Sequence, residues 1–225
     1  MARRFDLVIV DLDGTLVDSQ ALLVGLVNAT LSAHDHPPAA AETVAAAIGL
    51  PLEEVFRRAA PSVHEQRIAT LCAAYRRRAD AMEFVRQFRL FDDVAATLED
   101  LHTSGARVVV ATSKSRATSL DILTDCAVPH CIDEVIGGDS VTHGKPHREM
   151  VDHARHRFQA AAARTIMVGD TSFDIEMGKA AGVATCAVTY GTHSAVALRA
   201  LQPDFIIDRF AALYALVTAA PTSCE

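Results

Sequence analysis

Short apolar stretches alternate with amphipathic stretches along most of the chain, and their order predicts the architecture. Near-continuous aliphatic runs occupy residues 5–10, 107–112 and 165–170, and shorter runs follow them. Between these runs lie segments with apolar positions at helical spacing, such as 91–106, where Gly105 is a typical helix end. Strands without polar alternation are buried on both faces, and strands that alternate with helices form parallel sheets. The pattern therefore predicts an α/β fold, a doubly wound parallel sheet covered by helices on both faces.

The segment from residue 19 to residue 89 has a different texture. It is rich in Ala, Leu and Arg and reads as helices only, without any strand signal. Its helical pattern is interrupted by polar or Pro/Gly-containing breaks at 34–38, 49–51 and 59–62. A chain of 225 residues can accommodate one large domain with a smaller one inserted. We therefore expect an α/β core formed by residues 1–18 and 90–225, and an inserted all-helical domain formed by residues 19–89.

Polar side chains gather where three of the predicted strands end. Ligands bind outside the carboxyl ends of the strands in an open parallel sheet, so we expect these side chains to surround one crevice. They are Asp11, Asp13, Thr112, Ser113, Asp170 and Asp174. Four carboxylates in one crevice repel each other, and a divalent cation relieves that repulsion. Because oxygen ligands suit magnesium, and hydroxyls beside a glycine-rich turn suit a phosphate group, the pattern predicts a site for Mg²⁺ and a phosphate.

The distribution of lysine points to the same crevice. The chain contains 18 arginines but only three lysines, so a lysine stands out where any cation would serve. Lys145 lies between a glycine and a proline, on a loop that opens a predicted helix. Its compact ammonium could pair with both a carboxylate and a phosphate oxygen, although a surface lysine at a helix start is the alternative. We expect Lys114 and Lys179 to lie on solvated helix turns.

Composition excludes several classes of protein. The formal net charge of −7 argues against a nucleic-acid partner, which would require a basic surface. No apolar segment approaches the length of about 20 residues that a membrane span needs, and the first residues do not resemble a secretory signal. The five scattered cysteines include no C-x-x-C pair and favour reduced thiols in the cytoplasm: Cys72, Cys126, Cys131, Cys186 and Cys224.

Four ordered motifs identify a resemblance. They are DLDGT (11–15), ATS (111–113), GKP (144–146) and GDTSFDIEMGKAAG (169–182). Their order and context resemble the four motifs of the haloacid dehalogenase-like hydrolase superfamily, and the resemblance covers essentially the whole chain. Within that superfamily the chain looks most like the phosphoglycolate-phosphatase type. The resemblance implies a Rossmann-like core with a helical cap inserted after the first motif.

The resemblance also implies roles for individual residues. Asp11 would be the nucleophile that becomes a phosphoaspartate, and Asp13 would be the general acid and then the general base. The phosphate would be held by Gly14, Thr15, Thr112, Ser113 and Lys145. The ligands of Mg²⁺ would be Asp11, the backbone carbonyl of Asp13, Asp170 and, directly or through a water molecule, Asp174. Many relatives have Asn in place of Ser113, but the contact there is largely made by the backbone, so we expect little effect.

The subclass follows from two positions. Dehalogenases of the superfamily lack the second aspartate, which is present here as Asp13. Phosphosugar mutases carry a histidine where this chain has Leu23, so transfer to water is favoured over transfer between substrate positions. We therefore expect a magnesium-dependent phosphatase of a small-molecule phosphate monoester, acting as a monomer or homodimer. Phosphoglycolate, a sugar phosphate of a specialised biosynthetic pathway and pyrophosphate stay open as substrates, and a non-catalytic phosphate-binding protein is the alternative from another class.

We expect the helical segment, residues 19–89, to determine which substrate is bound. With eight arginines against seven acidic residues, it would form a mildly basic lid over the acidic crevice and would suit an anionic substrate, although a solvated helix face is the alternative for the arginines at 76–78. Residues 49–56 are expected to face the crevice and to select the leaving group.

Overall fold

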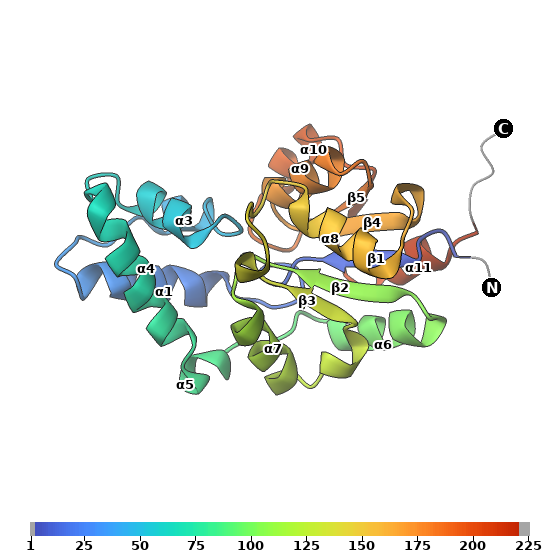
Figure 1. The fold of residues 1–225 in the computed structure, drawn as a ribbon, viewed down its shortest axis with the longest axis horizontal. Coiled ribbons are helices and arrows are strands. Elements are labelled where there is room, and N and C mark those ends of the chain that lie inside the picture. The colour runs from blue at the N-terminus through green and yellow to red at the C-terminus, as the bar shows by residue number, and fades with distance from the viewer. Residues whose placement is uncertain (1–2, 221–225) are drawn as a thin grey trace.

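The computed structural model describes residues 3–220. Six strands form a single parallel sheet in the order β3-β2-β1-β4-β5-β6. Their bounds are β1 (Leu7–Val10), β2 (Arg107–Ala111), β3 (Glu134–Ile136), β4 (Thr165–Gly169), β5 (Ala184–Val188) and β6 (Phe205–Ile207). The α/β fold with a parallel sheet is therefore confirmed, and the first strand of the chain lies inside the sheet rather than at its edge (Figure 1).

Helices cover both faces of the sheet, as the unpatterned strands predict. One face packs against α6 (Val94–Ser104), α7 (Arg116–Asp125) and α11 (Ala212–Thr218), and the other packs against α8 (Glu149–Phe158), α9 (Ser172–Ala180) and α10 (Ala195–Ala200). In β1, Val8 and Val10 pack in the first layer while Leu7 and Ile9 pack in the second. Short 3-10 turns complete the layers at η1 (Pro129–Cys131), η2 (Gly138–Ser140) and η3 (Ala162–Arg164).

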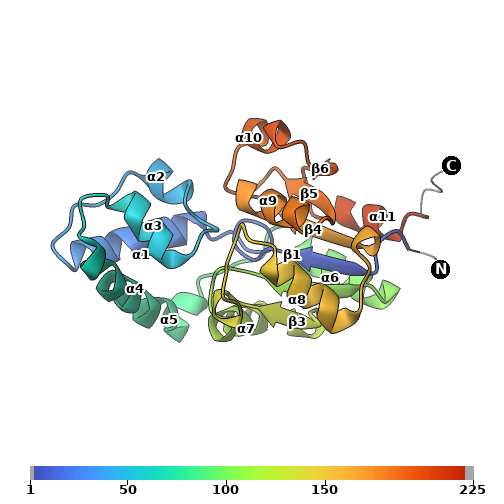
Figure 2. The same ribbon diagram turned by 45° about the horizontal axis from the view of Figure 1, so that its top comes forward.

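Five helices lie apart from the sheet. They are α1 (Gln20–Ser32), α2 (Ala41–Ala45), α3 (Leu52–Ala59), α4 (Glu65–Ala79) and α5 (Met82–Val85). Most of their buried side chains form a separate cluster that includes Leu31, Phe56 and Leu71. Figures 1 and 2 show this group at the end of the molecule opposite the two termini. We refer to residues 19–89 as the cap.

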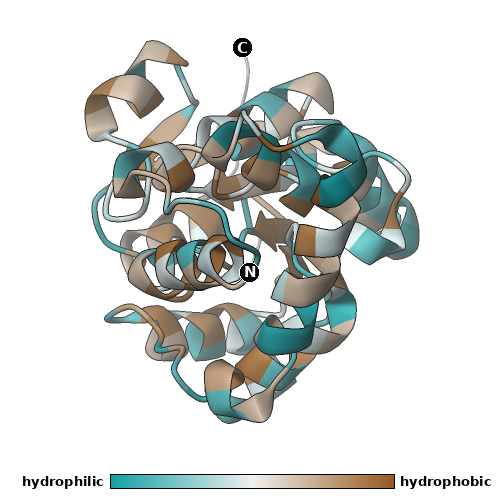
Figure 3. Cartoon of the chain, turned by 90° about the vertical axis from the view of Figure 1, so that its left-hand side faces the viewer, coloured by the Kyte–Doolittle hydropathy of each residue, from teal (hydrophilic) through white to brown (hydrophobic). Residues whose placement is uncertain are grey.

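The cap helices are two-sided. Leu23, Leu26, Val27 and Leu31 recur at helical spacing on the buried side of α1, and such a stripe packs a helix against its neighbours. In Figure 3, which looks onto the cap end of the molecule, hydrophobic and hydrophilic residues alternate along these helices. The cap is therefore held together by its own small apolar core.

Two segments join the cap to the sheet, and they run side by side. Val17 and Leu90 form an antiparallel bridge, and the Asp18 N–H donates to the Arg89 carbonyl at 2.9 Å. The Phe91 N–H donates to the Leu16 carbonyl at 3.0 Å. The chain therefore leaves and re-enters the core at one place.

The structure also bears on membrane-spanning segments and on the state of the cysteines. Within residues 3–220, no helix is both long enough and apolar enough to cross a membrane. Cys72, Cys126, Cys131 and Cys186 are free thiols, and Cys224 lies outside the described residues.

Candidate active site

The strand order brings the predicted site residues to one edge of the sheet. Because β1 pairs with β2 on one side and β4 on the other, the residues that follow these three strands are neighbours. They are Asp11 after β1, Thr112 after β2 and Asp170 after β4, and all three are buried. Asp13 and Asp174 are buried beside them. Residues that are distant in sequence therefore form one cluster.

Lys145 lies at the centre of the cluster. Its Nζ is 2.7 Å from Asp11 Oδ1 and 2.6 Å from Asp174 Oδ1, and the side chain is fully buried. Burial alone would lower the pKa of Lys145, but the two carboxylates outweigh it and raise that pKa. A fully buried ammonium between two carboxylates stays charged. The alternative of a surface lysine at a helix start does not describe this residue.

In this cluster of described residues, the negative charge of three buried carboxylates exceeds the positive charge of the Lys145 ammonium. Ligand oxygens of Asp11, Asp170 and Asp174 all lie within 4.8 Å of one another. Burial raises the pKa of Asp170 to about 6, and it raises the pKa of Asp11 well above its usual range although the Lys145 ammonium opposes this. Raised carboxyl pKa values indicate that nearby positive charge does not fully balance these carboxylates. Because all the potential ligand atoms are oxygens, the cluster suits a hard cation such as Mg²⁺. The residues present therefore fit the metal that the sequence predicts.

Hydrogen bonds hold two of these carboxylates in place. Asp170 accepts from the Thr15 hydroxyl at 2.9 Å and from the Thr192 N–H at 2.7 Å. Asp174 Oδ2 accepts from the Thr171 N–H at 3.0 Å and from the Thr171 hydroxyl at 2.7 Å. Thr171 and Thr192 were not predicted as site residues, although Thr171 is part of the GDTSFD motif. The bonds leave the carboxylates little freedom to turn away from the cluster.

Asp13 has a different partner. Its Oδ2 is 2.6 Å from the Nζ of Lys114, and these side chains are 11% and 12% exposed. The Lys114 Nζ also lies 5.1 Å from the centre of the Phe88 ring of the cap. The expectation that Lys114 sits on a solvated helix turn is therefore wrong, whereas Lys179 is exposed on α9 as expected. Two features of the sequence could have indicated that Lys114 belongs to the site: the scarcity of lysine, and its position directly after the ATS motif.

The turn after β1 requires glycine. Gly14 has a φ of +73°, and a Cβ at this position would collide with the carboxylate of Asp170. Only glycine adopts such a φ freely, so the main chain can pass close to the carboxylate cluster. Thr15 follows it and is buried. The DLDGT motif thus forms a tight turn against the carboxylate cluster.

Thr112 and Ser113 have unlike surroundings. The Thr112 hydroxyl accepts from the Lys114 N–H at 3.2 Å and stays in the core. The Ser113 hydroxyl donates to the carbonyl of Gly49 at 2.6 Å, and Gly49 belongs to the cap. The Ser113 side chain is therefore engaged in a contact between the core and the cap.

A cavity of about 580 Å³ opens between the carboxylates and the cap. On the core side it is lined by Asp11, Asp13 and residues 112–115, and on the cap side by helices α1, α3 and α4. Residues 49–53 and Val55 line it, in agreement with the expectation that segment 49–56 faces the crevice. The cavity is the space in which a bound molecule could contact the buried carboxylates.

The cap arginines do not form a basic lid over this cavity. Of the eight arginines of the cap, only Arg76 lines it. The Arg76 guanidinium is 2.8 Å from the Glu53 carboxylate, which also lines the cavity. The expectation of a basic lid is therefore wrong, because the other arginines point elsewhere and this one is already paired.

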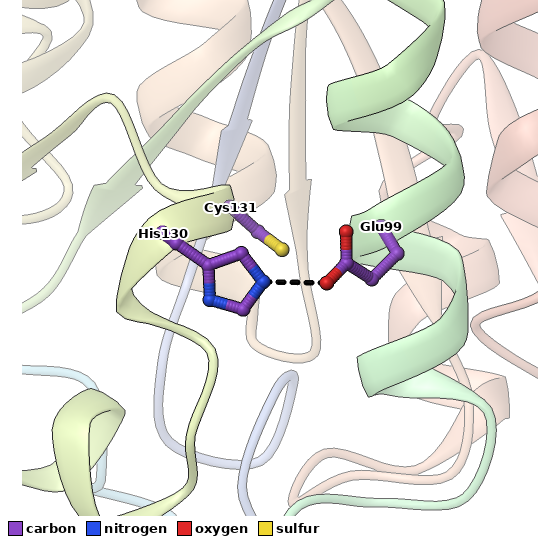
Figure 4. A group of neighbouring side chains, drawn as sticks. All are labelled: Glu99, His130 and Cys131. Carbon is purple, nitrogen blue, oxygen red and sulfur yellow. Dashed lines mark hydrogen bonds and ion pairs between the residues drawn. The ribbon is translucent and has the colours of Figure 1, made fainter.

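A second group of potential metal ligands lies elsewhere. Figure 4 shows Glu99 on α6 facing His130 and Cys131 on η1. The Glu99 Oε1 and His130 Nε2 atoms are 2.5 Å apart. Glu99 and His130 are exposed and Cys131 is buried. Burial raises the pKa of the Cys131 thiol to about 11, so it stays protonated at neutral pH. The Glu99–His130 contact ties η1 to α6 and takes no part in the crevice at the strand ends.

Comparisons with known proteins place this geometry in a family. A protein from Dickeya dadantii named "Probable phosphatase IndB" is 37% identical over 206 residues, which cover 91% of this chain and 90% of that protein. A protein from Cupriavidus necator named "Phosphoglycolate phosphatase, plasmid" is 33% identical and covers 95% and 93%. A protein from Halalkalibacterium halodurans named "Pyrophosphatase PpaX" is 30% identical and covers 89% and 91%.

A solved structure and a family model indicate the same family. The crystal structure of a haloacid dehalogenase-like hydrolase from Bacteroides fragilis superposes with a TM-score of 0.87 at 28% identity, covering 93% of this chain and 99% of that one. The model of the family described as haloacid dehalogenase-like hydrolase matches residues 8–188, which include all four sequence motifs and the whole cap. With its buried carboxylates, its central lysine and its helical cap in that order along the chain, this protein belongs to the haloacid dehalogenase-like hydrolases.

Proposed function

We propose that this protein is a magnesium-dependent phosphatase that hydrolyses a small-molecule phosphate monoester through a phosphoaspartate on Asp11. The observation that carries the proposal is the position of Lys145, buried between Asp11 and Asp174 at a cluster of oxygen ligands. The names of the relatives support it, since each of the three is called a phosphatase or a pyrophosphatase. In this proposal residues 1–18 and 90–225 form the catalytic core and residues 19–89 the cap.

Magnesium would be held by the oxygens of Asp11, Asp170 and Asp174 together with the backbone carbonyl of Asp13. When bound, the ion would neutralise the carboxylates and polarise a phosphate oxygen. Lys145 supplies the remaining positive charge beside the nucleophile. Thr112, the Ser113 amide and the turn of Gly14 and Thr15 would hold the other phosphate oxygens.

The first half-reaction forms a bond and breaks a bond at phosphorus. A carboxylate oxygen of Asp11 attacks phosphorus, and the bond from phosphorus to the ester oxygen breaks. Asp13 donates its proton to that leaving oxygen, which departs as an alcohol. The product left on the protein is an acyl phosphate on Asp11.

The second half-reaction restores the protein. The Asp13 carboxylate takes a proton from a water molecule, whose oxygen attacks phosphorus while the bond to Asp11 breaks. Inorganic phosphate leaves, and Asp13 is again protonated for the next cycle. Lys114 holds the Oδ2 atom of Asp13 at 2.6 Å, and the Oδ1 atom, which has no partner among residues 3–220, is the oxygen that exchanges the proton in both steps.

A non-catalytic phosphate-binding protein is the alternative, and one observation argues against it. Binding alone would not require a second carboxylate beside the nucleophile, yet Asp13 is buried there, and its Oδ1 has no hydrogen-bond partner among residues 3–220. A buried acceptor without a partner is costly in a purely structural role. It is available to receive or deliver a proton at a bound ester.

A phosphate-release assay tests the proposal. The purified protein is incubated with Mg²⁺ and a panel of phosphate monoesters, pyrophosphate and acetyl phosphate, and inorganic phosphate is measured. We expect release from at least one of them, and none from the Asp11→Asn variant prepared in parallel. Release by both proteins at one rate would indicate a contaminant, and binding of esters without release by the wild type would favour the non-catalytic alternative.

A further inference from the structure

The cavity changes character from one end to the other. At the core end its lining is polar, with Asp11, Asp13 and residues 112–115. At the cap end it is largely apolar, with the ring of Tyr75 and the following aliphatic side chains: Leu23, Val27, Val44, Ile48, Leu50, Leu52 and Val55. In the proposed reaction the phosphate occupies the polar end, so the leaving group faces the apolar end.

The size of the cavity exceeds what a very small leaving group would fill. Its volume of about 580 Å³ lies within the range of roughly 300–1,000 Å³ typical of pockets for drug-sized ligands. A leaving group of two carbons would leave most of this volume to water, and with it the accessible part of the apolar wall, chiefly the half-buried Leu52 and Tyr75. Burial of apolar surface stabilises a complex in proportion to the area removed from water, so this wall favours a body that covers it.

The charges of the lining do not favour a second anionic group. Besides Asp11 and Asp13, which the proposed reaction uses at the phosphate end, three acidic residues line the cavity: Glu53, Asp80 and Asp139. The lining contains only two cations among the described residues, Arg76 and Lys114. Arg76 is paired with Glu53 at 2.8 Å, and Lys114 is paired with Asp13 at 2.6 Å. A carboxylate or second phosphate on the leaving group would meet acidic walls whose cations are already neutralised.

We propose that the substrate is a phosphate monoester whose leaving group is uncharged, largely apolar and at least as large as a six-membered ring. The inference rests on the proposed phosphatase function and selects within it. It separates this chain from relatives named for phosphoglycolate and pyrophosphate, because both of those molecules carry a second anionic group. The aliphatic wall binds the body of the leaving group, and the paired charges of the lining discriminate against anions.

Esters of primary alcohols test the inference without a large difference in leaving-group reactivity. Cyclohexylmethyl phosphate and benzyl phosphate present apolar rings, ethyl phosphate presents a short neutral chain, and 2-phosphoglycolate presents a short anionic one. We expect kcat/KM for the ring esters to exceed that for ethyl phosphate and phosphoglycolate by about tenfold or more, since even one methylene in an apolar pocket can be worth tenfold. Preference for phosphoglycolate over both ring esters would overturn the inference.

A matched pair of variants tests the charge argument. Glu53→Gln removes the partner of Arg76 in the cavity wall, whereas Glu54→Gln removes the partner of Arg58 on the same helix outside the cavity. We expect Glu53→Gln to raise kcat/KM for phosphoglycolate relative to benzyl phosphate, and Glu54→Gln to leave the ratio unchanged. An unchanged ratio in both variants would show that the Arg76 pair does not govern selectivity.

The outcomes separate the two proposals. If no ester or anhydride is hydrolysed by the wild type under any metal condition, the proposed function itself fails. If phosphoglycolate or pyrophosphate is hydrolysed with the highest kcat/KM, the phosphatase stands and the inference about the leaving group is wrong.

Discussion

Asp11 and Asp13 are separated by one residue, yet each is paired with a different lysine. Asp11 contacts the buried ammonium of Lys145 and accepts from the Leu12 N–H at 2.7 Å, which orients one oxygen and keeps the other for phosphorus. Asp13 faces the cavity and pairs with Lys114. Replacing Asp11 by Asn should abolish turnover, because an amide is not a nucleophile toward phosphorus. Phosphate release near the wild-type rate by a folded, contaminant-free variant would remove Asp11 from this role.

Asp13→Asn should be severe without being absolute. A lost general acid or base lowers rates by about 10²–10⁴-fold, and the nucleophile is still in place. The reduction should be smaller for acetyl phosphate, whose leaving group needs no proton, when formation of the phosphoaspartate is measured in a single turnover. Equal losses of that step for acetyl phosphate and for an alkyl ester would argue that Asp13 does not protonate the leaving group.

The carboxylate cluster predicts how metal and protons compete. Burial raises the pKa of Asp170 to about 6, so in the metal-free protein this group ionises near that pH. A raised pKa in the folded state means that ionisation costs stability as the pH rises through it, and bound Mg²⁺ offsets that cost. We therefore expect Mg²⁺ to raise the melting temperature more at pH 8 than at pH 5. An equal rise at both pH values would mean that Mg²⁺ binds elsewhere.

Removal of metal should also remove activity. A chelator is expected to stop phosphate release and added Mg²⁺ to restore it, whereas Ca²⁺ should support little turnover because it takes more oxygen ligands at longer distances. Full activity in a chelated sample would contradict the electrostatic account of the cluster.

The residues of the crevice differ in how far the sequence could reveal them. Asp11, Lys145 and Asp170 stand at strand ends or in a Gly-Lys-Pro loop, and local signals were sufficient to select them. Lys114 was misread because its ion pair with Asp13 joins residues 101 positions apart. Thr192 acts through a backbone N–H, which has no signature in the side-chain pattern. Contacts of these kinds depend on the packing of elements that are distant in sequence.

At the scale of elements, α6 shows how apolar residues at helical spacing stabilise the fold by packing against the sheet. Val94, Leu98 and Leu101 are buried at helical spacing, and the helix ends at Gly105 with a φ of +79° as predicted. Leu98→Ala should lower the free energy of unfolding by about 2–5 kcal/mol, since a cavity is left beside the sheet. The exposed Thr103→Ala on the same helix should change it by less than about 0.5 kcal/mol. Urea denaturation of both variants checks this, and similar midpoints would contradict the packing account.

The existence of most elements follows from the sequence, and their order in the sheet does not. The apolar runs predicted the strands, but nothing in them states that β1 pairs with both β2 and β4. The beginning of α6 also differs: the pattern suggested Phe91, whereas the helix starts at Val94 because Asp93 takes a left-handed φ of +64°. This turn comes two residues after Phe91, whose N–H donates to the Leu16 carbonyl in the segment that leaves the core.

At the scale of the whole molecule, the cap covers the cavity and contacts the core beside it. The Thr118 hydroxyl on α7 donates to Asp80 Oδ1 at 2.5 Å, and the Ser113 hydroxyl donates to the Gly49 carbonyl. The two segments that join cap and core lie together near Val17 and Leu90. We predict that the cap acts as a lid that moves about the segments near Val17 and Leu90 and closes at the Asp80 and Gly49 contacts. The proposed chemistry needs such a lid, because water must be excluded while the ester is cleaved and admitted afterwards.

A reversible lock across the closing edge tests the lid. In the variant Asp80→Cys with Thr118→Cys, oxidation would join the cap to α7 where the two side chains now meet. We expect the oxidised protein to lose most turnover, since substrate can no longer enter nor alcohol leave, and a reductant to restore it. Thiol titration verifies the bond, and each single cysteine variant controls for the loss of the native hydrogen bond. Undiminished turnover by the fully oxidised protein would mean that the cavity exchanges its contents without opening of the cap, and that the segments near Val17 and Leu90 are a rigid connection rather than a hinge.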